Sequence, residues 1–255
     1  MKIFDSFADP GAGLDMIFRW LHILCGIAWI GLLYYFNFVQ TPAFAELSPA
    51  ARNEAFDKLA WRALWWFRWA AMGTFVLGLG LLGIWSSKDY VPGSSYFASA
   101  RGTAILTGAL FGITMAANVW MVIWPKQKIV IGSVRKVIAG GEADPAQPAA
   151  AKTAARASRA NVFFSVTMLW FMVFAPHFSG AFASNASGGT KNTLIYFILV
   201  LLIWAFVELN ALGKIGGYDS PFNKLVFDDH KKTIIFAFVN WAVIYLVGWE
   251  LIMRP

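Results

Sequence analysis

The chain has 255 residues, of which 58% are hydrophobic and 14% charged. A soluble domain carries about a quarter charged residues, so the composition excludes an ordinary soluble protein and indicates one that crosses a lipid bilayer several times. The net charge of +7 does not indicate nucleic-acid binding, because the basic residues are spread over loops between apolar helices, where they act as a positive-inside signal.

Six apolar runs are near the ~20 residues that a helix needs to cross a bilayer. The runs are continuous rather than alternating, which favours helices over a β-barrel. The sequence therefore predicts an all-α, polytopic membrane helix bundle that forms a single integral membrane domain over residues 1–255. We expect the spans at about 15–40, 64–86, 101–124, 161–183, 193–212 and 233–252.

The first span contains the stretch RWLHILCGIAWIGLLYYFNFVQ, residues 19–40, with one of the three histidines of the chain. His22 lies roughly 10 Å into this span at 1.5 Å per residue. Ionisable residues inside membrane spans are functional candidates. Arg19 lies three residues away on the same helix face, and so does Cys25. Gly26, one turn further on, leaves room beside His22 for a flat group.

The second and third spans contain several glycines, which make the helices narrow at these positions. Gly78, Gly80 and Gly83 lie in span two, and a GxxxG pair, Gly108 and Gly112, lies in span three. Small residues let helices approach closely, and the glycines of span two could also leave room for a porphyrin face. Helix packing is the more common explanation.

The segments after spans one, three and five carry 15 of the 21 Lys and Arg residues, counted with the adjoining helix ends. This bias predicts that these segments, including the long loop 125–160, are cytoplasmic and that both termini are periplasmic in a bacterial inner membrane. Within that loop we expect a mobile turn followed by a basic helix that runs into span four. The basic residues are Arg52, Lys58, Arg62, Arg68, Lys126, Lys128, Arg135, Lys136, Lys152, Arg156, Arg159, Lys214, Lys224, Lys231 and Lys232.

His177 lies about six residues before the expected end of span four, which runs opposite to span one. The two histidines therefore share the outer layer of the membrane on different helices, and two imidazoles can supply both axial ligands of a heme. Arg19 and Arg101 would then face the anionic propionates. Two alternatives remain: a copper or zinc site, or two histidines that only bond to a serine or a backbone carbonyl.

The remaining polar residues give weaker signals. We interpret four asparagines in the spans as interhelical hydrogen-bonding residues, and we expect Glu208 and Glu250 at the membrane interface because they lie near span ends. His230, beside two aspartates, belongs to a solvated cytoplasmic cluster. The asparagines are Asn37, Asn118, Asn161 and Asn240.

Several stretches resemble the membrane domain of bacterial membrane-bound urate hydroxylase, the cytochrome-fused type of urate oxidase. They are RWLHILCGIAWIGLLYYFNFV, WFRW, RGTAILTGALFGITMAANVWMVIWPKQK and the histidine of FAPHFSG, over about residues 15–180. The resemblance implies a heme-dependent or cytochrome-linked membrane oxidoreductase. Positions where the family has further histidines read Leu106, Thr107 and Ala160, so His22 and His177 carry over and the other site residues do not.

Together these features predict a b-type heme protein of the membrane that passes electrons to or from a periplasmic cytochrome c, with His22 and His177 on the iron. In the family a cytochrome c domain follows the membrane part, and we expect a periplasmic cytochrome c as a partner. A non-catalytic accessory subunit of a larger membrane complex, with other membrane subunits as partners, is the alternative. The sequence names no substrate, and enzymatic activity is left open.

Overall fold

The computed structural model describes residues 10–86, 96–177 and 189–253, and these residues form helices and turns without any strand. Six helical segments are long and apolar enough to cross a membrane, which confirms the predicted all-α bundle. They are Gly13–Glu46, Pro49–Ser86, Ala100–Ile138, Gln147–His177, Gly189–Ala211 and His230–Met253.

Several of these segments are composite helices. The elements are α2 (Pro10–Tyr34), π-helix η1 (Tyr35–Gln40), α3 (Thr41–Glu46), α4 (Pro49–Ala55), π-helix η2 (Phe56–Ala60), α5 (Trp61–Ser86), 3-10 helix η3 (Tyr96–Ala98), α6 (Ala100–Ala117), π-helix η4 (Asn118–Ile123), α7 (Trp124–Ile138), α8 (Gln147–His177), α10 (Gly189–Ala211), α11 (Pro221–Phe227), α12 (His230–Ala242) and π-helix η5 (Val243–Met253).

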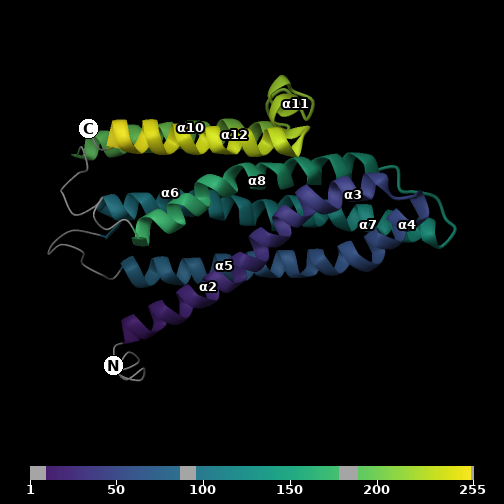
Figure 1. Cartoon of the computed structure of the whole chain (residues 1–255), viewed down its shortest axis with the longest axis horizontal. Coiled ribbons are helices and arrows are strands. Elements are labelled where there is room, and N and C mark those ends of the chain that lie inside the picture. The colour runs from purple at the N-terminus through teal and green to yellow at the C-terminus, as the bar shows by residue number, and fades with distance from the viewer. Residues whose placement is uncertain (1–9, 87–95, 178–188, 254–255) are drawn as a thin grey trace.

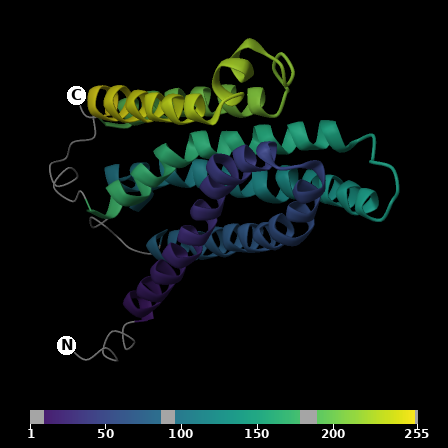
Figure 2. The ribbon, with the colours of Figure 1, turned by 45° about the vertical axis from the view of Figure 1, so that its right-hand side comes forward.

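The bundle is arranged in three layers (Figures 1 and 2). Helices α6 and α8 form the middle layer, α2 and α5 lie on one side of it, and α10 and α12 lie on the other. In the most apolar window of each span, 61% of the residues of α8 are buried but only 11% of those of the first span. Helix α8 is therefore the centre of the protein, and α2 is its most peripheral helix.

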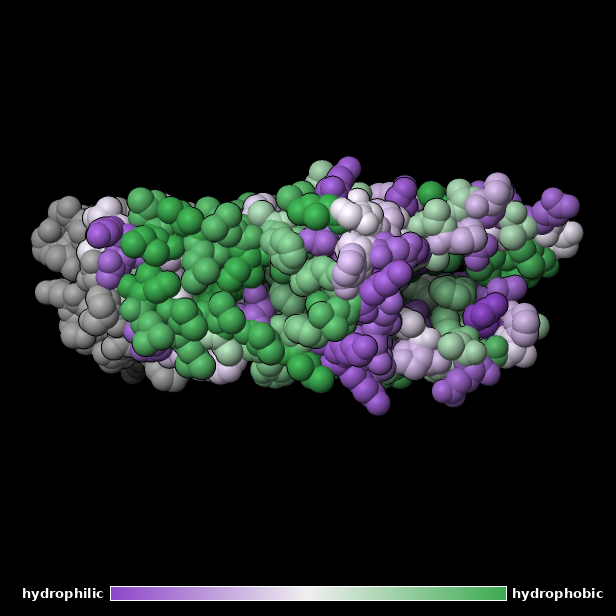
Figure 3. Space-filling view, turned by 90° about the horizontal axis from the view of Figure 1, so that it is seen from above, coloured by the Kyte–Doolittle hydropathy of each residue, from purple (hydrophilic) through white to green (hydrophobic). Residues whose placement is uncertain are grey.

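One end of the bundle is polar. It contains α3, α4, α7, the first half of α8 and α11, whereas α2 begins and η5 ends at the opposite end (Figure 1). Seen from above, apolar residues form a broad green area over the other half of the molecule, and hydrophilic residues gather toward this polar end (Figure 3). The helices thus extend well beyond the apolar band at this end (Figure 3).

The segment 125–160 contains the expected turn and a basic helix that runs into span four as part of α8, but it also contains an unexpected helix, α7. Helix α7 continues the third span to Ile138, and α8 already begins at Gln147, so the connection covers only residues 139–146. Ser133 Oγ holds it, donating to Gln147 Oε1 at 2.5 Å and accepting from the Asp144 amide at 2.8 Å. The four basic residues of α7 suggested a loop, but this helix buries apolar side chains, including Ile131.

Candidate functional site

His22 projects from α2 onto α5. Its Nδ1 lies 2.8 Å from the backbone oxygen of Thr74. A carbonyl oxygen only accepts, so Nδ1 donates and the neutral ring keeps its lone pair on Nε2. A Cβ at Gly78 would lie 3.0 Å from His22 Cε1, so this glycine lets the imidazole approach α5.

The glycines of α5 receive other side chains of α2 in the same way. A Cβ at Gly73 would lie 2.8 Å from Cys25 Sγ, and one at Gly80 would lie 2.4 Å from the ring of Phe18. The face of α5 formed by Gly73, Gly78 and Gly80 is therefore filled by α2, as helix packing requires. Gly26 and Gly83, in contrast, have no heavy atom within 4 Å of an added Cβ.

Arg19 lies in a small polar group at the start of α2. Its guanidinium is 2.8 Å from Asp15 and 5.2 Å from the ring centroid of Trp85, whose Nε1 donates to Asp15 at 3.2 Å. The positive charge of Arg19 is thus already paired with a carboxylate. Arg101 is half-buried in the first turn of α6.

His177 is exposed at the end of α8, directly after Pro176. The first half of α2 leans along α5 and away from α8 (Figures 1 and 2), and the hydrogen bond of His22 goes to α5. The structure therefore places the two imidazoles at the same end of the bundle, and no hydrogen bond or ring contact joins them in the described part of the chain. The described residues contain no group of three or more His, Cys, Asp or Glu side chains that could hold a metal ion.

A buried polar network in the core was not predicted as a site. Asn118 Nδ2 donates to Asn161 Oδ1 at 3.0 Å and to Glu208 Oε2 at 3.2 Å, and Asn161 Nδ2 donates to the Met115 carbonyl at 3.0 Å. We call Asn118, Asn161 and Glu208 the amide–carboxyl network. It links η4, α8 and α10, which confirms Asn118 and Asn161 as interhelical hydrogen-bonding residues.

The interfacial position expected for Glu208 is wrong, because only 7% of this residue is exposed. Its place near the end of α10 is covered by α11. Asn223 of α11 is fully buried and donates to the Asn210 carbonyl at 2.7 Å, and Ser220 Oγ donates to Asn210 Oδ1 at 3.2 Å. The sequence did contain a signal for this burial, because Glu208 follows Trp204 by four residues and so lies on the same face of α10. Trp204 faces α6 and donates to Thr114 Oγ1 at 2.9 Å.

The aspartates beside His230 have separate structural roles. Asp228 forms an ion pair with the buried Arg156 of α8, and Asp229 caps α12 by accepting from the Lys231 amide at 2.6 Å. The hydrogen bond that the Lys231 amide donates to the carboxylate holds the pKa of Asp229 below its ordinary value. The His230 ring lies 6.0 Å from that of Phe38. Asp228 and Asp229 are exposed, as expected for a solvated cluster, and Asp228 in addition joins this segment to α8.

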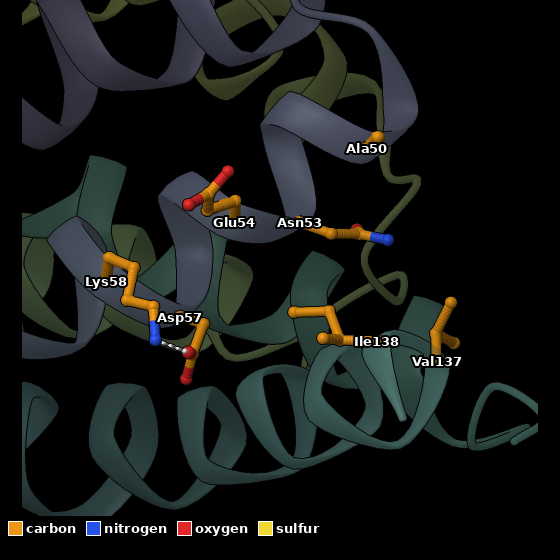
Figure 4. Close-up of a pocket in the computed structure, with 7 residues that line it drawn as sticks. All are labelled: Ala50, Asn53, Glu54, Asp57, Lys58, Val137 and Ile138. Carbon is orange, nitrogen blue, oxygen red and sulfur yellow. Dashed lines mark ion pairs between the residues drawn. The ribbon is translucent and has the colours of Figure 1, made fainter. Parts of the chain in front are cut away.

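A pocket of about 430 Å³ lies at the polar end, between α4, η2 and the end of α7 (Figure 4). Asp57 is its most strongly bonded residue, 3.3 Å from Lys58 and 2.6 Å from Arg135. Because the pocket and His22 belong to opposite ends of the bundle, it is not part of a histidine site. Its lining residues are Ala50, Asn53, Glu54, Asp57, Lys58, Val137 and Ile138.

Residues 93–210 match the family model described as urate oxidase N-terminal. This match confirms the resemblance seen in the sequence, but over different residues: it covers spans three to five, with Arg101, His177 and the whole amide–carboxyl network, and does not include His22 or Arg19. No curated protein and no solved structure matches the chain.

Proposed function

We propose, from the match of residues 93–210 to the urate oxidase N-terminal family and from the geometry of His22, that this membrane protein binds a b-type heme and carries electrons. His22 and His177 would be the axial ligands. When bound, a heme with two histidine ligands supplies one-electron transfer and leaves no open position on the iron for oxygen.

The observation that carries this proposal is the hydrogen bond between His22 Nδ1 and the Thr74 carbonyl, 2.8 Å long. Metal-ligating histidines almost always donate their other ring nitrogen to such an acceptor, which fixes both tautomer and ring orientation. His22 is therefore held with Nε2 as the nitrogen that can bind a metal. His22 fits one axial position, and the exposed ring of His177 supplies the second donor from α8.

The surroundings suggest where the rest of the group would lie. The face of α5 at Gly78 and Gly80 is filled by α2, so the face at Gly26, which has no neighbouring atom within 4 Å, is the better candidate. Arg19 and Arg101 are the cations that would meet the propionates, and Arg19 also pairs with Asp15.

We further propose that the polar end is cytoplasmic in a bacterial inner membrane and that both termini are periplasmic. The support is the bias of Lys and Arg toward the polar end. The histidines then lie on the periplasmic side, where a cytochrome c is the natural electron partner, and the donor is a reductant within the bilayer or another membrane subunit.

The visible spectrum of the protein, purified in mild detergent after expression with sufficient heme, tests the first proposal. We expect a Soret band of six-coordinate, low-spin heme. His22→Ala and His177→Ala should each convert it to a five-coordinate spectrum or abolish it, and His230→Ala at the polar end should leave it unchanged. A wild-type protein without a Soret band would overturn heme binding.

Labelling of single cysteines in intact cells tests the orientation. In a Cys25→Ser background, Pro145→Cys, in the turn between α7 and α8, should react with an impermeant maleimide only after the cells are opened. Reaction in intact cells would reverse the orientation and place the histidines on the cytoplasmic side.

The second candidate function is a non-catalytic accessory subunit. One observation favours it: the small-residue face of α5 packs Phe18, His22 and Cys25 of α2, as expected for helices that only need to associate. The same visible spectrum distinguishes the two functions, since an accessory subunit without a cofactor has no Soret band.

A further inference from the structure

The amide–carboxyl network places an acidic side chain deep in the bundle without a cation. Glu208 is 7% exposed, and among the described residues no Lys, Arg or His nitrogen lies within 4.0 Å of its carboxyl oxygens. An ionised carboxylate in such a place costs several kcal/mol when no opposite charge compensates it. Ionisable residues in this position mark proton or ion pathways in membrane proteins.

The charged groups of the neighbouring elements are engaged elsewhere. On α8, Arg156 binds Asp228 and Arg159 donates to the Phe227 carbonyl. Lys152 pairs with Asp219 at 2.6 Å. Lys214 after α10, Lys224 on α11 and Lys231 and Lys232 on α12 are exposed. Glu250 of η5 belongs to the opposite end of the bundle.

The network provides a hydrogen-bond donor to the carboxyl group of Glu208, rather than oxygen ligands for a metal ion. Asn118 turns its Nδ2 toward Glu208 Oε2, and the side-chain oxygen of Asn161 already accepts from the same Nδ2. Sodium or calcium would need several oxygen ligands around it and would here face an N–H group. A proton needs only one carboxyl oxygen, so the geometry favours a proton over a metal cation.

Further buried polar residues follow Glu208 toward the polar end. Asn210, two residues further on α10, bonds to Ser220 and Asn223, and the buried Oδ1 of Asn223 has no hydrogen-bond partner among the described residues. Buried polar atoms of this kind are satisfied by internal water. Water at this point would give a proton a route through α11.

We propose that Glu208 is a proton-binding site in the buried core of the bundle, where Asn118 orients the carboxyl group and protons exchange with water at the polar end. Binding of one proton converts the carboxylate to the neutral acid, and release regenerates it. This proposal is independent of heme binding, and it assigns the network a chemical role beyond helix packing.

Infrared spectroscopy of the full chain in lipid nanodiscs tests it. We expect the carbonyl stretch of a protonated carboxylic acid, shifted in D₂O because the proton exchanges, and lost as the pH is raised. Glu208→Gln should abolish the band and retain the fold, since glutamine keeps an oxygen that accepts from Asn118. Glu46→Gln, at an exposed carboxyl, is the matched control and should keep it.

A second variant separates proton binding from structure. Asn118→Leu removes a hydrogen-bond donor that stabilises the ionised carboxylate of Glu208. The band should therefore persist to higher pH, because the variant binds the proton with roughly tenfold higher affinity, equivalent to 1.4 kcal/mol. A band that survives Glu208→Gln, no band at any pH at which the protein stays folded, or a band that does not shift in D₂O would each overturn the proposal.

Discussion

The two polar regions of this protein differ in how their helices meet. In the α2–α5 pair, His22 bonds to a backbone carbonyl across a glycine face, and the first span is the least buried of the six. In the amide–carboxyl network, side chains of three segments bond to one another in the core. A glycine face tolerates changes that flexible side chains can absorb, whereas a buried network fails when one member is removed.

The largest effect on stability is expected at Asn161. Asn161→Leu removes the side-chain bond to the Met115 carbonyl and leaves one buried N–H of Asn118 without its acceptor, so it should destabilise the bundle by about 3 kcal/mol. Asn240→Leu, which removes a single bond to Thr167, should cost about 1 kcal/mol. Reversible unfolding in mixed micelles measures both. Equal losses of stability in the two variants would show that the hydrogen bonds of the network contribute independently of one another.

The next largest effect concerns the glycine face. Gly80→Val forces the Phe18 ring away from α5 and should destabilise by about 2 kcal/mol relative to Gly83→Val, because Gly83 has open space at its Cβ position. Thermal denaturation of the two variants in the same detergent gives the difference. Equal midpoints would mean that α2 already moves freely on α5.

A smaller effect is expected where α2 meets the central helix. Tyr34 Oη and Ser165 Oγ lie 2.8 Å apart, and Tyr34→Phe removes this bond at a cost of about 1 kcal/mol. Hydrogen exchange should then increase in the second half of α2, while the first half, which rests on α5, stays unchanged. An increase along all of α2 would contradict this division of the helix.

The smallest effect is expected at the exposed pair of Lys152 and Asp219. The ammonium of Lys152 lowers the pKa of Asp219 below its ordinary value of 3.8. The pair therefore stabilises the protein above that value, and its contribution disappears as the pH falls through the lowered pKa. Asp219→Asn should be slightly less stable than wild type near neutral pH and equal to it in acid, with a difference that salt reduces. A difference that grows in acid would be inconsistent with this sign.

The sequence predicted the bundle because length and apolar composition determine how a helix crosses a bilayer, and His22 because a histidine is conspicuous in an apolar run. It did not predict the partner of His22, since a backbone carbonyl leaves no sequence signal. It misplaced Glu208 because depth was measured from the end of α10, whereas α11 folds over that end. The extent of α7 was missed because its basic residues suit a loop as well as a helix outside the membrane.

The glycine face between α2 and α5 also has a consequence for biogenesis. Its residues belong to the first two spans to be synthesised, so these spans can associate as a hairpin while the ribosome is still translating the rest. The amide–carboxyl network needs Asn118, Asn161 and Glu208 together. Spans three and four can already join Asn118 to Asn161, but the network closes only when the fifth span has left the translocon and supplies Glu208.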